Sequence, residues 1–161
     1  MSRFAESTGT TSYYGLPHIK ADIYKLAGNP TESAIRTIWL AILAYTFRVT
    51  SDFSHSYESD VSGGVVVVKH RQQKVLVVKC KAAQCGTKAD VWTAAAEQLQ
   101  ERMKENRVYG AVAIGGKVRF YEYDGREQRV VGLKGHEKEF DLAGDCEGVQ
   151  KVLDSMRDGG R

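Results

Sequence analysis

Two lysines at the end of an apolar segment are the first candidates for chemistry in this sequence. Val75 to Val78 lead directly into Lys79, Cys80 and Lys81. If this segment is a β-strand, its side chains alternate, so Lys79 and Lys81 point to one face of a sheet and Cys80 to the other. A lysine ammonium has three hydrogen-bond donors and no acceptor. Two such groups on one face can hold an anion such as phosphate, but neither can ligate a metal cation.

A valine-rich hairpin is expected to position these lysines. Residues 65–68 and 75–78 are nearly all apolar and only a short polar segment separates them, which is typical of an antiparallel hairpin buried on both faces. If paired residue numbers sum to about 143, Asp60 lies opposite residue 83, and a bulge at Gly63-Gly64 shifts Asp60 toward Lys81. We therefore expect Asp60 to meet the two lysines at one end of the hairpin.

Other polar residues are candidates with weaker support. Asp52 or Glu58 could equally be the acid in place of Asp60. His55, in a polar loop before Asp60, could act as a base, although a lone loop histidine is usually only solvated. The sequence carries no Ser/His/Asp or Cys/His motif, and Gly115-Gly116-Lys117 lacks the upstream glycine of a phosphate-binding loop. We interpret that glycine pair as a tight turn.

The predicted turn of the valine hairpin is basic. Lys69, Arg71 and Lys74 surround it, together with His70. Such a turn is either exposed to solvent and screened by salt or placed to contact the phosphate backbone of a nucleic acid. The net charge of +3 and the isoelectric point of about 8.7 are compatible with a nucleic-acid partner without requiring one.

Hydrophobic periodicity predicts one α/β domain over residues 15–161, after a flexible terminus at 1–14. The expected helices are 16–26, 30–47, 91–103 and a last helix from Asp145, and the expected strands are 65–69, 75–81, 109–114, 117–123 and 129–133. Asn29 and Pro30 are the expected start of the second helix. This order predicts a mixed sheet of about five strands covered by helices.

The remaining composition indicates an intracellular protein, cytoplasmic or nuclear. Three cysteines, Cys80, Cys85 and Cys146, have neither the pairing of a disulfide framework nor the spacing of a zinc site. We expect no secretory signal, because the first residues contain no apolar core. We also expect no membrane association, because the most apolar helix candidate, residues 35–47, contains Arg36 and is too short to cross a bilayer.

The layout resembles that of the PD-(D/E)XK nuclease superfamily, which has the restriction-endonuclease-like fold. An acid on one strand, a hairpin, a charged-x-Lys at the end of an apolar strand and a helix carrying Glu and Gln follow one another between residues 31 and 124. In that family, the first acid and the Glu or Asp of Glu/Asp-x-Lys bind a divalent metal, and the lysine positions or activates the attacking water. The resemblance implies that Asp60 is the first acid and Lys81 the lysine.

Lys79 stands where this family has its second acid, and an ammonium repels Mg²⁺ instead of binding it. In the preferred hypothesis, Lys79 has replaced the metal, and the domain binds nucleic acid or a protein partner without hydrolysis. In the alternative, Glu97, next to Gln98 on the following helix, joins Asp60 in binding Mg²⁺ or Mn²⁺ for cleavage of DNA or RNA. A third hypothesis is a non-catalytic scaffold that forms a homodimer through a sheet edge or the last helix. Enzymatic activity therefore stays open at this point.

Overall fold

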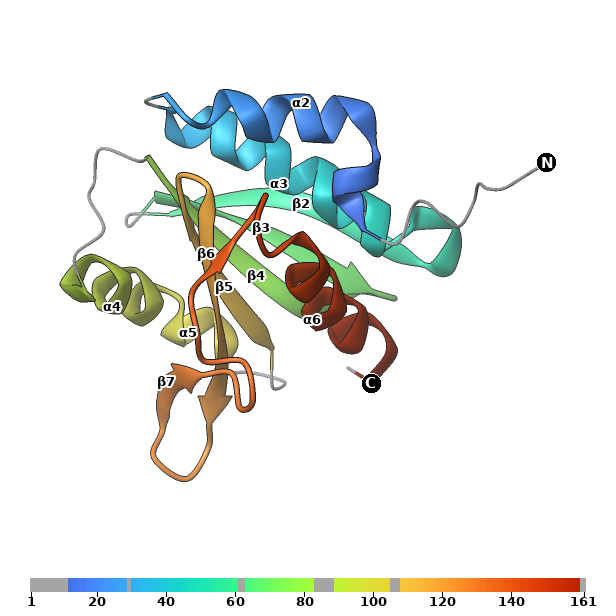
Figure 1. The fold of residues 1–161 in the computed structure, drawn as a ribbon. Helices are drawn as coiled ribbons and strands as arrows, with labels where there is room; N and C mark the ends of the chain where they lie inside the picture. The colour runs from blue at the N-terminus through green and yellow to red at the C-terminus, as the bar shows by residue number, and fades with distance from the viewer. Residues whose placement is uncertain (1–11, 29, 61–62, 83–88, 105–107, 160–161) are drawn as a thin grey trace.

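A mixed β-sheet with helices on both faces forms the structure (Figure 1). The computed structural model describes residues 12–28, 30–60, 63–82, 89–104 and 108–159. The helices are η1 (Tyr13–Gly15), α2 (Pro17–Lys25), α3 (Glu32–Thr46), η2 (Val49–Ser51), α4 (Ala89–Gln98), α5 (Gln100–Met103) and α6 (Cys146–Gly159). The strands are β2 (Phe53–Asp60), β3 (Gly63–His70), β4 (Gln73–Lys81), β5 (Tyr109–Ile114), β6 (Lys117–Asp124), β7 (Arg129–Gly132) and β8 (Phe140–Asp141).

The sheet has the order β2-β3-β4-β5-β6-β7, with β8 paired to β6. Strands β4 and β5 are parallel and are connected through α4 and α5, whereas the other pairs are antiparallel. The predicted α/β class with a mixed sheet and flanking helices is confirmed. The predicted number of about five strands is wrong, because the described residues contain seven.

Strand β2 is the main feature that the sequence prediction missed. Its residues pair one by one with β3, from Phe53 opposite His70 to Asp60 opposite Gly63. Because β2 lies at the edge of the sheet, Ser54, Ser56 and most of the other side chains after Phe53 are exposed or only half-buried. A strand with so few apolar residues does not show the alternation by which strands are recognised.

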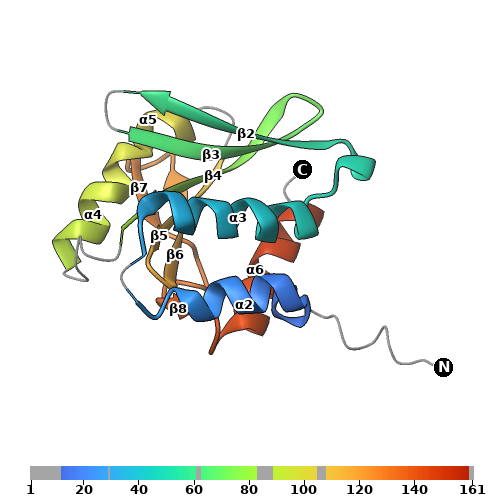
Figure 2. The same cartoon turned by 90° about the horizontal axis from the view of Figure 1, so that it is seen from above.

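The helices divide into two layers, one on each face of the sheet (Figure 2). Helices α2, α3 and α6 cover one face, where Val66, Val68 and Val78 belong to the core. Helices α4 and α5 cover the other face, where Val65 and Val77 contribute. The expectation that this hairpin is buried on both faces is therefore confirmed.

The N-terminal end of the described chain is tied into the core, contrary to the predicted flexible segment 1–14, of which residues 1–11 lie outside the described residues. Tyr13 is fully buried. Its backbone N–H donates to Oε1 of Gln150 on α6, and its hydroxyl donates to the carbonyl of Leu142. The amide nitrogen of Gln150 in turn donates to the hydroxyl of Thr46, so one buried side chain joins η1, α3 and α6.

The start of α3 also differs from the prediction. Thr31 caps the helix by accepting a hydrogen bond from the backbone N–H of Ala34, and Pro30 precedes the helix. Asn29, the predicted cap, lies outside the described residues. Among the described helices, none is long and apolar enough to cross a membrane.

Substitution of Gly110 by alanine should destabilise the fold. An added β-carbon would lie 2.5 Å from Sδ of the buried Met103 and 3.3 Å from Cδ1 of Leu99. We expect the free energy of unfolding in urea to fall by about 1–3 kcal/mol, the usual cost of overpacking. Gly116→Ala is the control, because no atom lies within 4 Å of its added β-carbon, and it should change stability by less than about 0.5 kcal/mol. Equal losses in the two variants would contradict this packing.

Candidate functional site

The end of β4 has the predicted alternation. Lys79 shares the face of Val77, which packs under α4, whereas Cys80 belongs to the core on the other face. The exposed fraction of Lys79 is only 3%, and that of Cys80 is 4%. Lys79 is therefore a buried cation within the sheet and not a charge at its solvent-exposed rim.

Asp60 reaches this end of the sheet by a different route from the one predicted. It ends β2, and its backbone pairs with Gly63 at the start of β3. A β-carbon added at Gly63 would lie 2.8 Å from Nζ of Lys79. The Asp60 backbone, Gly63 and the Lys79 ammonium are thus brought to the same end of the sheet.

The register of the valine hairpin agrees closely with the expected pairing. Val66 pairs with Val78 and Val68 with Leu76, so paired residue numbers sum to 144 instead of the expected 143 or so. The irregularity lies between Val68 and Lys69, near the turn, and not at Gly63-Gly64. The bulge predicted at the glycines is therefore wrong; the extra strand β2 brings Asp60 to this end.

Lys81 is the more accessible of the two lysines. It is half-buried at the last position of β4, beside Ile114 of β5. Its carbonyl accepts a hydrogen bond from the backbone N–H of Gly115. No ion pair links its ammonium to a carboxylate among the described residues. Residues 83–88, which follow this strand closely, lie outside the described part of the chain.

The two alternative acids are engaged elsewhere. The Glu58 carboxylate lies 2.9 Å from Nη1 of Arg102 on α5, and both side chains are partly buried. The Asp52 carboxylate lies at the other end of the hairpin, 3.3 Å from Nε of Arg71. Arg102 is a charged residue near the site that the sequence did not reveal, because 44 positions separate it from Glu58 and no local spacing connects them.

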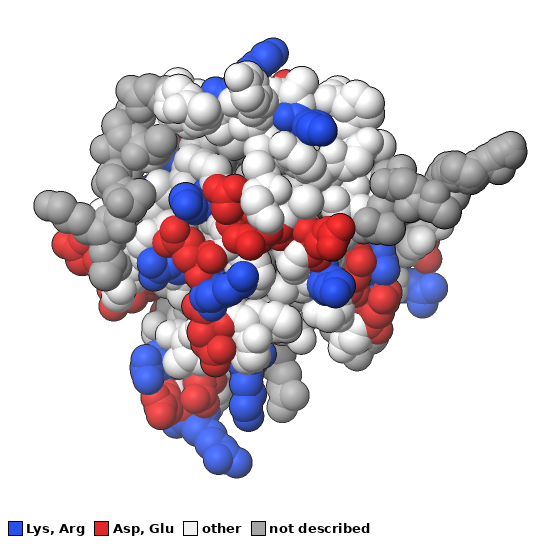
Figure 3. Space-filling view, in the orientation of Figure 1, with Lys and Arg blue, Asp and Glu red and all other residues white. Residues whose placement is uncertain are grey.

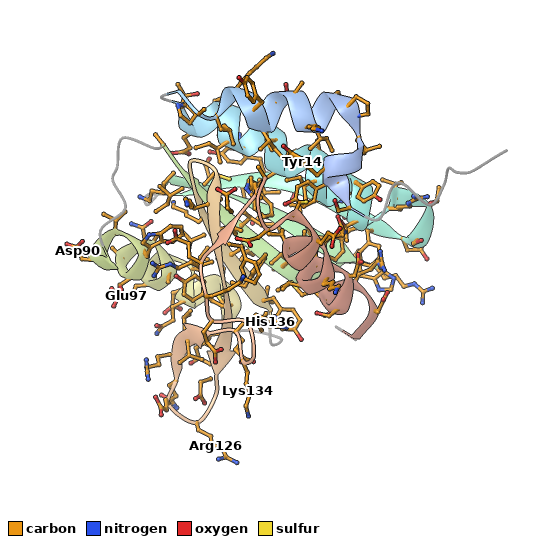
Figure 4. All side chains as sticks on the ribbon, in the orientation of Figure 1. Tyr14, Asp90, Glu97, Arg126, Lys134 and His136 are labelled. Atoms are coloured by element: carbon orange, nitrogen blue, oxygen red, sulfur yellow. The ribbon has the colours of Figure 1, made fainter. Side chains whose placement is uncertain are left out.

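Glu97 and Gln98 are exposed on α4. Figure 4 shows Glu97 on the outer side of the helix. It lines a groove of about 470 Å³ between α4 and strands β6 and β7, together with Arg119 and Arg129. Arg119 is itself paired with Glu139 at 3.0 Å. Within the described residues, no group of three His, Cys, Asp or Glu side chains can hold a metal ion. The metal site of Asp60 and Glu97 therefore stays a prediction.

His55 lies within β2, opposite Val68, and not in a loop as predicted. Its Nε2 is buried and has no hydrogen-bond partner among the described groups. The predicted base therefore has a structured position on the edge strand, about five residues from Asp60 along the chain.

The basic hairpin turn has an unusual pairing of like charges. Lys69 lies directly opposite Lys74 across the hairpin, an arrangement that destabilises a strand pair. Neither lysine forms an ion pair with a carboxylate of the described chain. Seven residues at about 3.3 Å each place Lys74 roughly 23 Å from Lys81. The basic turn and the end of β4 that carries Lys79 and Lys81 are therefore two separate regions.

The surface in the orientation of Figure 3 carries interspersed charges of both signs and no extended basic patch. Basic side chains that could attract an anion are therefore better candidates at the two ends of the β3–β4 hairpin than on this face.

Scans of protein-family models, curated proteins and solved structures find no match to the chain.

Alkylation should report on the burial of Cys80 in β4. Only a thiolate attacks iodoacetamide, and burial raises the pKa of the Cys80 thiol to about 12. At about pH 8, roughly one Cys80 in ten thousand would then be ionised. We expect Cys80 to be labelled only after unfolding and the half-buried Cys146 to be labelled sooner, as measured by peptide mass spectrometry. Rapid labelling of native Cys80 would contradict the burial of Cys80 in the core described here.

Proposed function

We propose that the chain is a restriction-endonuclease-like domain that has lost metal-dependent hydrolysis and binds nucleic acid without cutting it. The burial of Lys79 at the position of the family's second acid carries this proposal. A divalent ion about 4 Å from a charged ammonium is repelled by about 8 kcal/mol at an effective dielectric constant of about 20. Mg²⁺ bound by carboxylates and water has no compensating ligand in a lysine side chain.

The topology supports the family assignment within this proposal. Strands β2, β3 and β4 form an antiparallel meander, α4 and α5 cross over, and β5 joins β4 in parallel. This is the succession of acid-bearing strand, hairpin, Lys-ending strand and helix that the resemblance implies. Glu97 gives no support to the active-nuclease alternative, because it is exposed and lies in the groove beside β6 and β7.

The basic hairpin turn is the binding surface in this proposal. Lys79 is too deeply buried to present its ammonium to a phosphate arriving from solvent. Lys69 and Lys74 instead form an unfavourable pair that a phosphate between them would stabilise. Arg71 adds a guanidinium, which suits phosphate geometry.

The first test is a search for cleavage. The wild-type protein should not cut single- or double-stranded DNA or RNA with Mg²⁺ or Mn²⁺, and calorimetry should detect no binding of either metal. The variant Lys79→Glu removes the repelling charge and supplies a carboxylate, so it should gain Mn²⁺ binding. Lys79→Gln is the matched control, because it removes the charge without adding a ligand, and it should gain none.

Folding of each variant is checked by circular dichroism before the metal titration. Metal-dependent cleavage by the wild type that disappears in Asp60→Ala or Lys81→Ala would overturn the loss of hydrolysis. It would also favour the hypothesis in which another acid, such as Glu97, completes the site.

The second test measures binding through its salt dependence. Lys69→Gln and Lys74→Gln should each weaken the affinity for nucleic acid and lower the slope of log K against log salt concentration by about 1. Lys151→Gln, an exposed lysine on α6, should change neither value. An unchanged slope in both hairpin variants, measured by fluorescence anisotropy, would exclude the turn as the binding surface.

A further inference from the structure

A groove of about 650 Å³ lies between the β3–β4 turn and the C-terminal end of α6. Its volume lies within the range of small-ligand sites. Arg71 and Lys74 line its hairpin side, and Val75 and Met156 are among its apolar residues. The groove therefore combines cations with apolar surface, which is the combination that a nucleotide requires.

Hydrogen bonds fix the hairpin side of the groove, which still offers N–H donors to a ligand. Arg71 and Gln72 have φ values of 53° and 74°, and the backbone N–H of Arg71 donates to the carbonyl of Asp52. The Asp52 carboxylate accepts from Nε of Arg71 at 3.3 Å. The two terminal nitrogens of this guanidinium, and the ammonium of Lys74, have no partner among the described residues.

On the opposite wall, carboxylates engage the charge of Arg157. Arg157 donates through Nε and Nη2 to the Asp158 carboxylate, and its Nη1 lies 3.3 Å from the carboxylate of Asp154. Because its nitrogens are engaged, this arginine is a poor phosphate ligand. Asp158, which lines the groove, repels phosphate but can accept hydrogen bonds from the amino groups of a base.

An aromatic pair also lines the groove. The rings of Phe53 and His70 lie 4.5 Å apart between centroids, and both residues contribute to the lining. Phe53 packs further against Phe47, so the pair is fixed from behind. A base can pack on such a surface whatever its sequence, because every base has a π-face.

We propose that this groove takes one nucleotide of a single-stranded nucleic acid. The phosphate contacts Arg71 and Lys74, and the base packs on Val75 and the Phe53–His70 pair. A base within a duplex is stacked and paired, so it cannot enter, whereas a base in a single strand can. The inference rests on the proposed function and specifies its substrate as single-stranded.

Fluorescence anisotropy with the full-length protein tests this inference. The probes are a labelled single strand of about 12 nucleotides, within the site sizes of single-strand binders, and the matching duplex. Ser51 is exposed and lines the groove, so Ser51→Trp should fill it with a bulky side chain. Thr50→Trp is the matched control, because Thr50 is equally exposed but does not line the groove.

We expect tighter binding of the single strand than of the duplex. Ser51→Trp should weaken single-strand binding about tenfold or more, the loss of one stacked base, and Thr50→Trp should leave it unchanged. A nucleoside monophosphate should compete better than inorganic phosphate. Equal competition by the two would show a phosphate site without a base site and overturn the inference.

The failures of the two proposals are distinguishable. Equal affinity for single strand and duplex, with no effect of Ser51→Trp, would overturn the inference and leave nucleic-acid binding intact. Absence of binding to either probe at low salt would overturn the proposed function and the inference with it.

Discussion

The burial of the β3–β4 hairpin on both faces is the constraint on which the rest of the structure depends. Each buried valine contributes about 1.5–3 kcal/mol relative to an exposed one, and these strands supply valines to both cores. Because the face of β4 that carries Val77 packs in the core with α4 and α5, Lys79 lies in the interior and not at the rim. The position of this charge therefore follows from the packing of its neighbours, and the chemistry available at the site follows from the charge.

The two groups of lysines predicted on the β3–β4 hairpin lie at its opposite ends. The end of the hairpin opposite its turn contains Gly63, Lys79 and Lys81, and the turn about 23 Å away contains Lys69 and Lys74. A rigid sheet connects the two regions, but no ligand the size of a nucleotide spans them. On the proposed function, loss of metal chemistry at one end leaves phosphate binding at the other unaffected, so a scaffold can keep its affinity after its activity is gone.

Apolar runs separated by short turns allowed most strands to be predicted from the sequence, and the Gly115-Gly116 turn was correctly placed, with Gly115 at a φ of 60°. Strand β2 was not predicted because an edge strand tolerates polar residues on both sides. For the same reason, His55 was wrongly placed in a loop. The direction of Glu97 could not be predicted either. Successive side chains are about 100° apart around a helix, so a shift of about two residues turns a side chain to the opposite side, and helix boundaries are not fixed by sequence to that accuracy.

A lysine in the interior of a sheet is costly to bury, so its position calls for a physical account. A lysine that only ended β4 would extend its ammonium into solvent. Lys81 does so in part, because its side chain is only half-buried. On the proposed function, an ammonium supplies positive charge where the family has a cation, but it has no empty orbitals with which to polarise a phosphate or acidify a water. On this argument Lys79 preserves the electrostatic balance of the site while removing its Lewis acid.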